Sequence, residues 1–221
     1  MTNNLCAAPP SAKHSVDEIV ETLATQGYVF DCYPLEAELT SNLFALLLAQ
    51  DQSRFKTAGV GRELDHQVNR FVRTDEILWL DNDQSSVALQ TYLTWIETLR
   101  LAINRRLYLG LFDYECHFAT YSEGAYYKRH TDAFNGERNR LVSTILYLNP
   151  NWQHGDGGEL VLYSPAMAGP FESERTHVVE PTFGKLVLFL SEQFPHEVLV
   201  SHKARYSLTG WFRVRQHFKA A

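Results

Sequence analysis

The sequence contains little cysteine and no long hydrophobic run. Its three cysteines, Cys6, Cys32 and Cys116, are odd in number and far apart, so their spacing indicates neither a disulfide framework nor a zinc site. No segment approaches the roughly 18 consecutive apolar residues of a membrane span. Residues 1–14 lack the apolar core and the basic cluster of a secretory signal. We therefore expect a cytoplasmic protein with free thiols and no membrane partner.

Long runs of one charge are also absent, as are internal repeats and low-complexity tracts. The net charge of −6 is spread over 221 residues, which argues against a nucleic-acid partner held by a basic face. The length suits one large domain, and a hydrophobic content of 45% can fill a sizeable core. We predict a disordered N-terminus over residues 1–14, a single domain over residues 15–221, and a monomer.

The first half of the chain has the hydrophobic period of helices. Ser15 and Glu18 fit a capping box that opens a helix, and Gly27 suits the left-handed residue that ends it. Residues 51–69 have no hydrophobic period and several basic side chains, which predicts a long, flexible loop. The other elements expected here are a strand over 28–32, a helix from Pro34 to about residue 50, a strand over 70–80 and a helix over about 86–106.

From about residue 112 the pattern changes to the alternation of half-buried strands. Helices followed by about eight strands with glycine-rich turns predict an α+β fold. Its core would be a double-stranded β-helix, the jelly roll of cupin-like barrels. We expect a helical scaffold over residues 15–110, packed on one sheet of a barrel core over about 111–215. The predicted strands are 114–121, 126–132, 140–148, 159–163, 176–180, 185–190, 196–200 and 204–214.

The predicted strand 126–132 carries two types of metal ligand at a spacing of two. Side chains at this spacing leave the same face of a strand, so His130 and Asp132 should project together. An imidazole and a carboxylate on one face make two-thirds of the 2-His-1-carboxylate triad that holds non-haem Fe(II) and leaves coordination positions open. His196, within Pro195-His196-Glu197, supplies the distant second histidine. We predict that His130, Asp132 and His196 are the metal ligands and the catalytic centre.

An arginine nine residues after His196 is expected to point into the same barrel. Alternation puts Arg205, Ser207, Thr209 and Trp211 on one face of a strand. A guanidinium inside a barrel is costly unless it is paired, and a small dicarboxylate would pair with it through two hydrogen bonds. The pattern therefore favours an anionic ligand beside the metal.

These residues make the chain similar to a known family. It resembles the Fe(II)/2-oxoglutarate-dependent oxygenases, within them the prolyl 4-hydroxylases, and most closely the hypoxia-inducible-factor prolyl hydroxylases and their bacterial relatives. The resemblance covers about residues 70–215. Collagen-type members usually carry a lysine where this chain has Arg205. The matching motifs are Tyr121, His130-Thr131-Asp132, Tyr147-Leu148-Asn149, Trp152, Gly157-Gly158-Glu159-Leu160, Pro195-His196-Glu197 and Arg205 with Trp211.

The resemblance implies Fe(II) as cofactor, 2-oxoglutarate and O2 as cosubstrates, and ascorbate as an accessory reductant. 2-Oxoglutarate would chelate the iron, Arg205 would pair with its far carboxylate, and Tyr147 would donate a hydrogen bond to the same group. Its decarboxylation to succinate and CO2 would accompany hydroxylation of the substrate. The other positions that match the cosubstrate pocket are Tyr121, Thr209, Ile145, Leu160 and Val198.

The resemblance also implies a substrate, a proline presented by a protein segment. Arg140 and Trp211 fall on the substrate side of the related sites. The loop from residue 54 to 69 falls where related enzymes carry a mobile loop over the peptide, and Arg54, Lys56 and Arg62 would suit an acidic or polar partner. Bacterial members are associated with a prolyl site in translation elongation factor Tu, so that protein is the first candidate partner.

Several alternatives stay open. The same chemistry could act on a ribosomal-protein proline or on a free amino acid, and the loop over 54–69 could simply be solvated. A non-catalytic cupin-like module that binds or senses a ligand is a further alternative, although it would not need both the triad and Arg205. His117 shares strand parity with Tyr121, so one alternative is that it faces the pocket, but we expect a satisfied core histidine there. His202 is the rival third iron ligand but lacks the Pro-His-Glu context.

Overall fold

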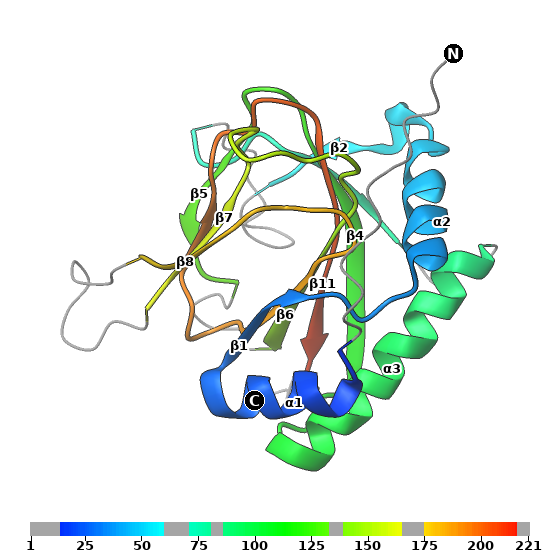
Figure 1. Ribbon diagram of the computed structural model, residues 1–221, viewed down its shortest axis with the longest axis vertical. Helices are drawn as coiled ribbons and strands as arrows, with labels where there is room; N and C mark the ends of the chain where they lie inside the picture. The colour runs from blue at the N-terminus through cyan, green and yellow to red at the C-terminus, as the bar shows by residue number, and fades with distance from the viewer. Residues whose placement is uncertain (1–13, 60–70, 81–85, 133–138, 165–174, 216–221) are drawn as a thin grey trace, which may run out of the picture.

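The computed structural model describes residues 14–59, 71–80, 86–132, 139–164 and 175–215. Most of the predicted N-terminal lead and the part of the basic loop that contains Arg62 lie outside the described residues. Within the described part, the helices stand on one side of two antiparallel sheets (Figure 1). The predicted α+β fold with helices packed on one sheet is confirmed.

Helix α1 (Val16–Gln26) begins and ends as its sequence predicts. The Ser15 hydroxyl accepts from the Glu18 amide, and the Glu18 carboxylate accepts from the Ser15 amide at 2.8 Å, which completes the capping box. Helix α2 (Ala37–Leu48) begins later than the predicted Pro34, because Glu36 is the residue with the extended N-cap conformation. Helix α3 spans Val87–Leu107. No described helix is both long and apolar enough to cross a membrane.

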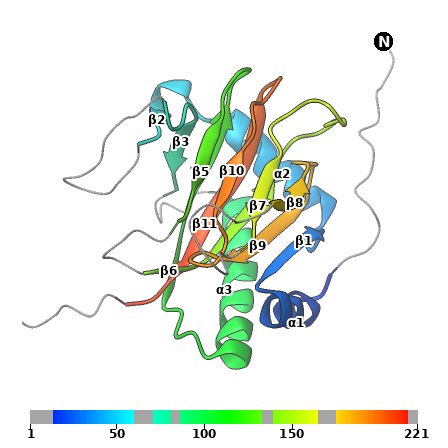
Figure 2. The ribbon, with the colours of Figure 1, turned by 90° about the vertical axis from the view of Figure 1, so that its left-hand side faces the viewer.

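The strands form a seven-stranded sheet in the order β1-β9-β6-β11-β4-β3-β2 and a four-stranded sheet in the order β5-β10-β7-β8. Figure 2 looks onto the four-stranded sheet, with the helices behind the larger one. Each of the eight strands predicted after residue 112 is present. The bounds are β1 Tyr28–Cys32, β2 Lys56–Thr57, β3 Glu76–Trp79, β4 Asp113–Tyr121, β5 Tyr127–His130, β6 Arg140–Tyr147, β7 Leu160–Tyr163, β8 Arg175–Val179, β9 Leu186–Leu190, β10 His196–Val198 and β11 Arg205–Arg213.

The described residues between 51 and 80 differ from the prediction. A short 3-10 helix (η1, Gln52–Arg54) and β2 stand in the first part of the expected loop. The predicted strand over 70–80 is reduced to β3, because this segment passes from one sheet to the other. Arg73 forms a bridge with Tyr127 of the four-stranded sheet, whereas β3 pairs with β4 of the large sheet.

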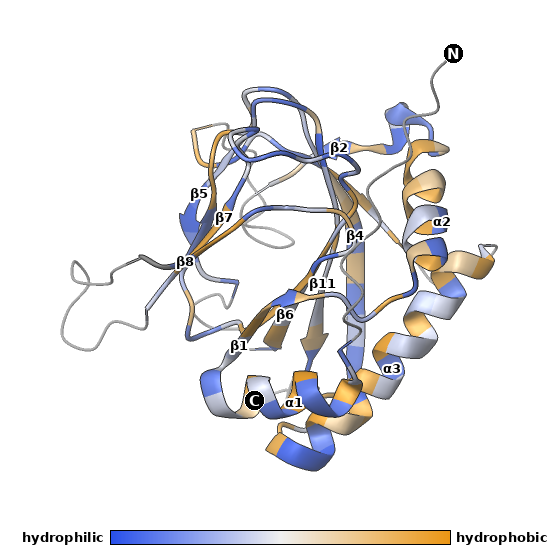
Figure 3. Cartoon of the chain, viewed as in Figure 1, coloured by the Kyte–Doolittle hydropathy of each residue, from blue (hydrophilic) through white to orange (hydrophobic). Residues whose placement is uncertain are grey.

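The hydrophobic residues fill two layers, one on each face of the large sheet. The first layer lies between this sheet and the helices, where hydrophobic residues recur along α1, α2 and α3 (Figure 3). The second layer lies between the two sheets and includes Tyr121, Ile145, Tyr147 and Leu160. Strand β6 is covered on both faces, so its residues from Val142 onward are all buried. The second layer is where the predicted site residues gather.

A glycine in β11 makes room for a buried hydrogen-bond chain in the first layer. The Tyr114 hydroxyl lies 3.0 Å from the Tyr92 hydroxyl and 2.8 Å from Thr144 Oγ1. A β-carbon at Gly210 would overlap the Tyr114 ring and hydroxyl. A glycine inside a central strand is thus explained by the close approach of another group.

Candidate metal centre and cosubstrate pocket

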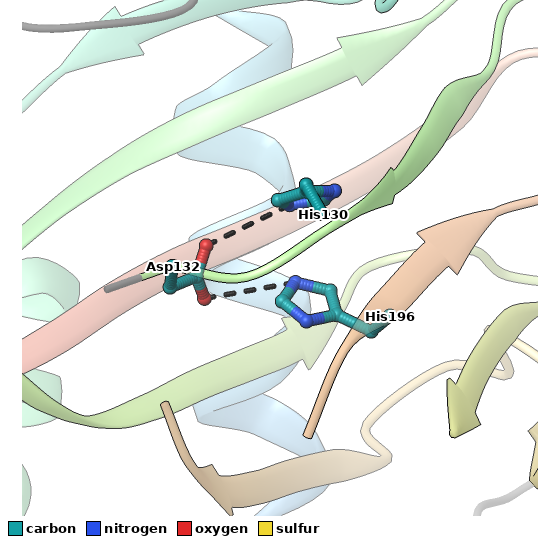
Figure 4. Close-up of side chains that lie close together, drawn as sticks. All are labelled: His130, Asp132 and His196. Atoms are coloured by element: carbon teal, nitrogen blue, oxygen red, sulfur yellow. Dashed lines mark ion pairs between the residues drawn. The ribbon is translucent and has the colours of Figure 1, made fainter. Parts of the chain in front are cut away.

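The three predicted metal ligands converge at one edge of the four-stranded sheet (Figure 4). His130 ends β5 and His196 begins β10, and the two residues are paired in register. Asp132 Oδ1 lies 3.7 Å from His130 Nε2, and Asp132 Oδ2 lies 3.6 Å from His196 Nε2. The expected strand over 126–132 is too long, because β5 ends at His130 and Asp132 reaches the site from the bend that follows.

Hydrogen bonds to the far side of each ligand fix its orientation. His130 Nδ1 lies 2.8 Å from Lys128 O, and His196 Nδ1 lies 3.0 Å from Phe194 O. With Nδ1–H as the donor, each Nε2 keeps its lone pair directed at the space shared with Asp132. Ser143 of β6 donates to Asp132 Oδ2 at 2.6 Å, so the large sheet also holds the carboxylate.

The charge states of the ligands also suit a divalent metal. Burial alone would raise the pKa of Asp132, but His196, His130 and the Ser143 hydroxyl together hold it well below its ordinary value. Burial and the neighbouring His130 lower the pKa of His196 to about 4. At neutral pH the carboxylate is therefore ionised and the His196 ring is neutral, which are the forms that bind a metal.

A cavity of about 290 Å³ opens beside the triad, between the two sheets. Four alternate residues of β11 line it, namely Arg205, Ser207, Thr209 and Trp211, as the alternation predicted. Each of them is paired in register with a residue of the adjacent strand β4. These four partners also line the cavity, and they are Tyr121, Ala119, His117 and Glu115.

Arg205 lies in this cavity without an acidic partner. Its side chain is only 1% exposed, and its Nε donates to Gly158 O at 2.9 Å. No carboxylate in the described part of the chain lies within ion-pair distance of its guanidinium. The Tyr147 hydroxyl lies beside it but makes no well-formed hydrogen bond. A buried cation left this way is costly unless an anionic ligand pairs with it.

Comparison with known proteins agrees with this geometry. Residues 116–213 match the family model described as the 2OG-Fe(II) oxygenase superfamily. The crystal structure of a Pseudomonas putida prolyl-4-hydroxylase is 40% identical in sequence, with a TM-score of 0.78. The match covers 91% of this chain and 100% of that one. The chain belongs to the 2OG-Fe(II) oxygenase superfamily.

Two further relatives of this oxygenase are prolyl hydroxylases. One is the prolyl hydroxylase of Trichoplax adhaerens, solved in complex with a hypoxia-inducible-factor peptide. It is 27% identical, with a TM-score of 0.73, and the match covers 90% of this chain and 88% of that one. The other, prolyl hydroxylase EGLN3 of Mus musculus, is 34% identical over 149 residues, which are 65% of this chain. The match spans 59% of the length of that mouse protein.

The residues of this oxygenase fit the metal and the cosubstrate that the superfamily name specifies. Two neutral imidazole nitrogens and a carboxylate are the donor set of non-haem Fe(II) sites. The unpaired guanidinium of Arg205 suits the far carboxylate of 2-oxoglutarate. The cavity is also lined by most of the other predicted residues, namely Tyr121, Thr209, Ile145, Leu160, Val198, Arg140 and Trp211.

Two predicted substrate residues, Arg54 and Lys56, lie away from the cavity. Arg54 is exposed and donates to Gln50 Oε1 at 2.7 Å, and Lys56 is exposed on the edge strand β2. Neither lines the cavity, and Arg62 lies outside the described residues, so the lid remains a prediction. The rival ligand His202 is exposed and lies 3.0 Å from Gly155 O through its Nδ1. It is not part of the metal-ligand group found among the described residues.

Sequence reasoning missed a chain of contacts behind His130. Asp75 is fully buried, and its two oxygens accept from Arg73 Nε and Nη2 at 2.7 and 2.6 Å. The Arg73 guanidinium lies 4.1 Å from the centre of the Tyr127 ring, which stacks on His130. Arg73 and Asp75 share strand parity, but nothing local to them indicates Tyr127 as their neighbour.

His117 is buried, as expected of a core histidine, but the expectation that its polar atoms are satisfied is wrong. His117 lines the cavity, and its buried Nδ1 has no hydrogen-bond partner among the described residues. The parity that it shares with Tyr121 was a usable signal for its direction. The missing partner depends on side chains from other strands, which the sequence does not place.

Proposed function

We propose that this chain is a prolyl 4-hydroxylase that uses Fe(II), 2-oxoglutarate and O2 to hydroxylate a proline in a cytoplasmic protein. The observation that carries the proposal is the buried, unpaired Arg205 in the same cavity as the triad. A metal site alone fits many functions, whereas a triad beside a buried cation without an acidic partner suits a metal and an anion together. The likeness to the Pseudomonas putida prolyl-4-hydroxylase over its whole chain supports the choice of proline.

In this proposal His130, Asp132 and His196 hold the iron. Bound Fe(II) would supply the redox chemistry that couples 2-oxoglutarate decarboxylation by O2, giving succinate and CO2, to oxygen insertion into a substrate C–H bond. The protein keeps Asp132 ionised and each histidine oriented through its Nδ1 hydrogen bond. Three protein ligands leave positions open for the reactants, and ascorbate would keep the iron reduced.

Arg205 and Tyr147 would hold the far carboxylate of 2-oxoglutarate. The Arg205 guanidinium offers two parallel donors, and the Tyr147 hydroxyl next to it offers a third. Burial raises the pKa of Tyr147 to about 12, so the hydroxyl keeps its proton for this bond at neutral pH. Tyr121, Thr209, Ile145, Leu160 and Val198 would form the surrounding wall and exclude water.

The substrate would enter over Arg140 and Trp211. The Arg140 guanidinium lies 3.7 Å from the centre of the Trp211 ring, and its Nε donates to Glu115 Oε1 at 2.7 Å, which fixes it at the cavity wall. Elongation factor Tu is the first candidate substrate, on the ground of the bacterial resemblance. Arg54, Lys56 and Arg62 would contact the protein substrate from the loop, because exposed cations there attract acidic or polar surfaces.

The test is to incubate the enzyme with Fe(II), ascorbate, 2-oxoglutarate and elongation factor Tu, and to map added oxygen by peptide mass spectrometry. We expect one oxygen on a proline, with one succinate formed for each. A host lysate treated in the same way would find other protein substrates. Oxygen on a lysine, an asparagine or a free amino acid, with prolines unchanged, would overturn the prolyl assignment and leave the iron chemistry standing.

A further inference from the structure

Two buried serine hydroxyls lie behind the metal ligand Asp132. Ser143 belongs to β6 and Ser191 directly follows β9, and the two residues are only 1% and 0% exposed. Ser143 Oγ lies 2.6 Å from Asp132 Oδ2 and 2.9 Å from Ser191 Oγ. Among the described residues, Ser143 is the one hydrogen-bond partner of the Ser191 hydroxyl. Neither serine lines the cavity, so contact with a ligand in the cavity does not explain this buried pair.

The chemistry of the three side chains fixes the direction of both hydrogen bonds. A serine hydroxyl has one proton to donate and two lone pairs, whereas an ionised carboxylate can only accept. A carboxylate that binds a metal is ionised. The single proton of Ser143 therefore goes to Asp132 Oδ2, and Ser191 must be the donor in its bond with Ser143. The result is a chain of donors that runs from Ser191 through Ser143 to Asp132.

The first bond of this chain strengthens the second. A hydroxyl that accepts a hydrogen bond is polarised, which strengthens the bond that it donates by about 10–30%. The bond from Ser143 to Asp132 is of the charge-assisted type, and its length of 2.6 Å lies in the range of such bonds. Because the Ser191 proton occupies one side of the Ser143 oxygen, it also limits rotation of the Ser143 hydroxyl away from Asp132.

The chain makes the two oxygens of Asp132 unequal. Oδ2 accepts the bond from Ser143, whereas no described residue donates a hydrogen bond to Oδ1. Figure 4 shows Oδ1 directed toward His130, and its distance from His130 Nε2 is 3.7 Å. Oδ1 thus keeps its lone pairs for a metal, while Oδ2 serves to orient the carboxylate.

The backbone around the two serines is held by both neighbouring strands. Ser143 is paired in register with Phe189 of β9, and the Ser191 amide donates to Leu141 O at 3.0 Å. Phe189 also packs on the ring of the metal ligand His196, with ring centres 4.7 Å apart. The end of β9 therefore supports two of the three metal ligands, one by direct contact and one through the serine of β6.

We propose that Ser191 is a positioning residue of the metal centre. It donates to Ser143, which donates to Asp132 Oδ2, and this chain holds the carboxylate with Oδ1 presented to the metal. The inference rests on the iron site of the proposed function, but it does not depend on proline as the substrate. It assigns a role in metal binding to a side chain that contacts neither the metal position nor the cavity.

The test measures the binding of Co(II), which is stable in air and whose visible absorption reports the arrangement of its ligands. Competition against a coloured chelator, without 2-oxoglutarate, gives the affinity. Ser143→Ala should lower it roughly tenfold to a hundredfold, as is usual when a metal ligand loses its hydrogen-bond partner. Ser191→Ala should lower it roughly threefold to tenfold, the effect of one neutral hydrogen bond. Both variants should shift the Co(II) absorption in the same direction.

A double variant and a control separate positioning from a structural role. Because Ser191 acts only through Ser143, Ser191→Ala should cause no further loss of affinity in a protein that already carries Ser143→Ala. The matched control is Ser201→Ala, the same exchange at another fully buried serine, whose Oγ donates to Lys203 O at 2.6 Å. It should lose thermal stability as Ser191→Ala does, but it should keep the wild-type affinity and the wild-type Co(II) absorption.

Each outcome decides the proposal. Wild-type affinity and absorption in Ser191→Ala overturn it, and this comparison stands alone if Ser143→Ala does not fold. Equal losses in Ser201→Ala, or additive losses in the double variant, also overturn it. If the wild-type protein binds no Co(II), Mn(II) or Fe(II), the iron site fails and the chain of donors fails with it. If metal binding follows the prediction but no proline is hydroxylated, the proposed function fails and the role of Ser191 is upheld.

Discussion

The ring of Tyr127 stacks on the ring of His130, with centres 3.5 Å apart and planes inclined by 11°. His130 carries its ligand nitrogen at the end of a short strand, where the contact between its Nδ1 and Lys128 O still leaves the ring some freedom to tilt. The stack removes that freedom from one face, and the Arg73 guanidinium holds Tyr127 from a distance of 4.1 Å. The Arg73–Asp75 ion pair therefore acts on the metal centre through an aromatic ring.

Removing this stack should weaken iron binding without removing a ligand. An aromatic pair contributes about 0.5–1.5 kcal/mol beyond its buried area, so Tyr127→Leu should lower the affinity for Fe(II) by roughly threefold to tenfold. Tyr127→Phe should keep it, because the ring rather than the hydroxyl makes the contact. Competition against a coloured chelator measures the Fe(II) affinity of both variants. Tyr126→Leu, the same exchange at the preceding residue outside the cavity, is the control, and an equal loss there would refute the role of the stack.

Loss of a ligand should have a much larger effect. In His196→Ala only two protein ligands remain, so most Fe(II) or Mn(II) binding and all substrate-dependent turnover should disappear. Metal analysis after gel filtration, together with succinate formation, gives the readout. His202→Ala is the matched variant and should retain both. Full iron occupancy and activity in His196→Ala would direct attention to His202 instead.

Arg205 should control the cosubstrate and not the metal. Arg205→Lys keeps the charge but loses the two parallel donors, so the apparent affinity for 2-oxoglutarate should fall by about tenfold or more, as expected for a charged hydrogen bond. Iron binding should persist. Arg106→Lys, at an exposed ion pair with Glu21, should change neither quantity. Unchanged 2-oxoglutarate binding in Arg205→Ala would mean that the cavity has been assigned to the wrong ligand.

The buried His117 should make the protein less stable in acid. Its pKa falls from an ordinary 6.5 to about 3 in the folded chain, so between these values the unfolded chain binds a proton that the folded chain does not. Stability should therefore fall as the pH drops from about 6.5 towards 3, by at most about 1.4 kcal/mol per pH unit from this group. Urea unfolding at pH 7 and pH 5, with a chelator present, measures how the free energy of unfolding changes with pH. His117→Phe should have a shallower slope than wild type, and an identical slope would contradict the assignment.

The glycine in β11 should tolerate no side chain. In Gly210→Ala the new β-carbon would overlap the Tyr114 hydroxyl and lie 2.7 Å from Glu115 O. Overpacking typically costs about 1–3 kcal/mol, and the buried hydrogen bonds of Tyr114 would be disturbed as well. The control is Gly124→Ala, where a β-carbon would have open space but the backbone has a positive φ of 83°. The backbone strain in this variant should lower the free energy of unfolding by only about 1–2 kcal/mol. Thermal unfolding should show that Gly210→Ala is the less stable variant. The reverse order would show that the Tyr114 side chain can move aside at little cost.

The alternation after residue 112 was sufficient to predict the barrel strands and the face of β11 that lines the cavity. Chemistry supplied what pattern could not, because the donor set of Fe(II) required a distant histidine and His196 was available. The segment from Arg73 to Trp79 was harder. It begins beside the four-stranded sheet and continues into the large one, and the hydrophobic pattern of such a segment is the same as that of a single strand. For His117 the burial was predicted correctly, but the missing hydrogen-bond partner of Nδ1 depends on side chains from other strands, which the sequence does not place.

Strand β11 carries Arg205 at one end of the cavity and Trp211 at the other, and it is paired with β4 over all nine of its residues. A slip of one residue would turn Tyr206, Leu208 and Gly210 inward and disable both ends together. Pairing with β6 on the opposite edge blocks such a slip. If Arg205 binds the cosubstrate and Trp211 contacts the substrate, as proposed, the preference for each can be altered independently, one alternate side chain at a time. Insertions in this strand have no such freedom.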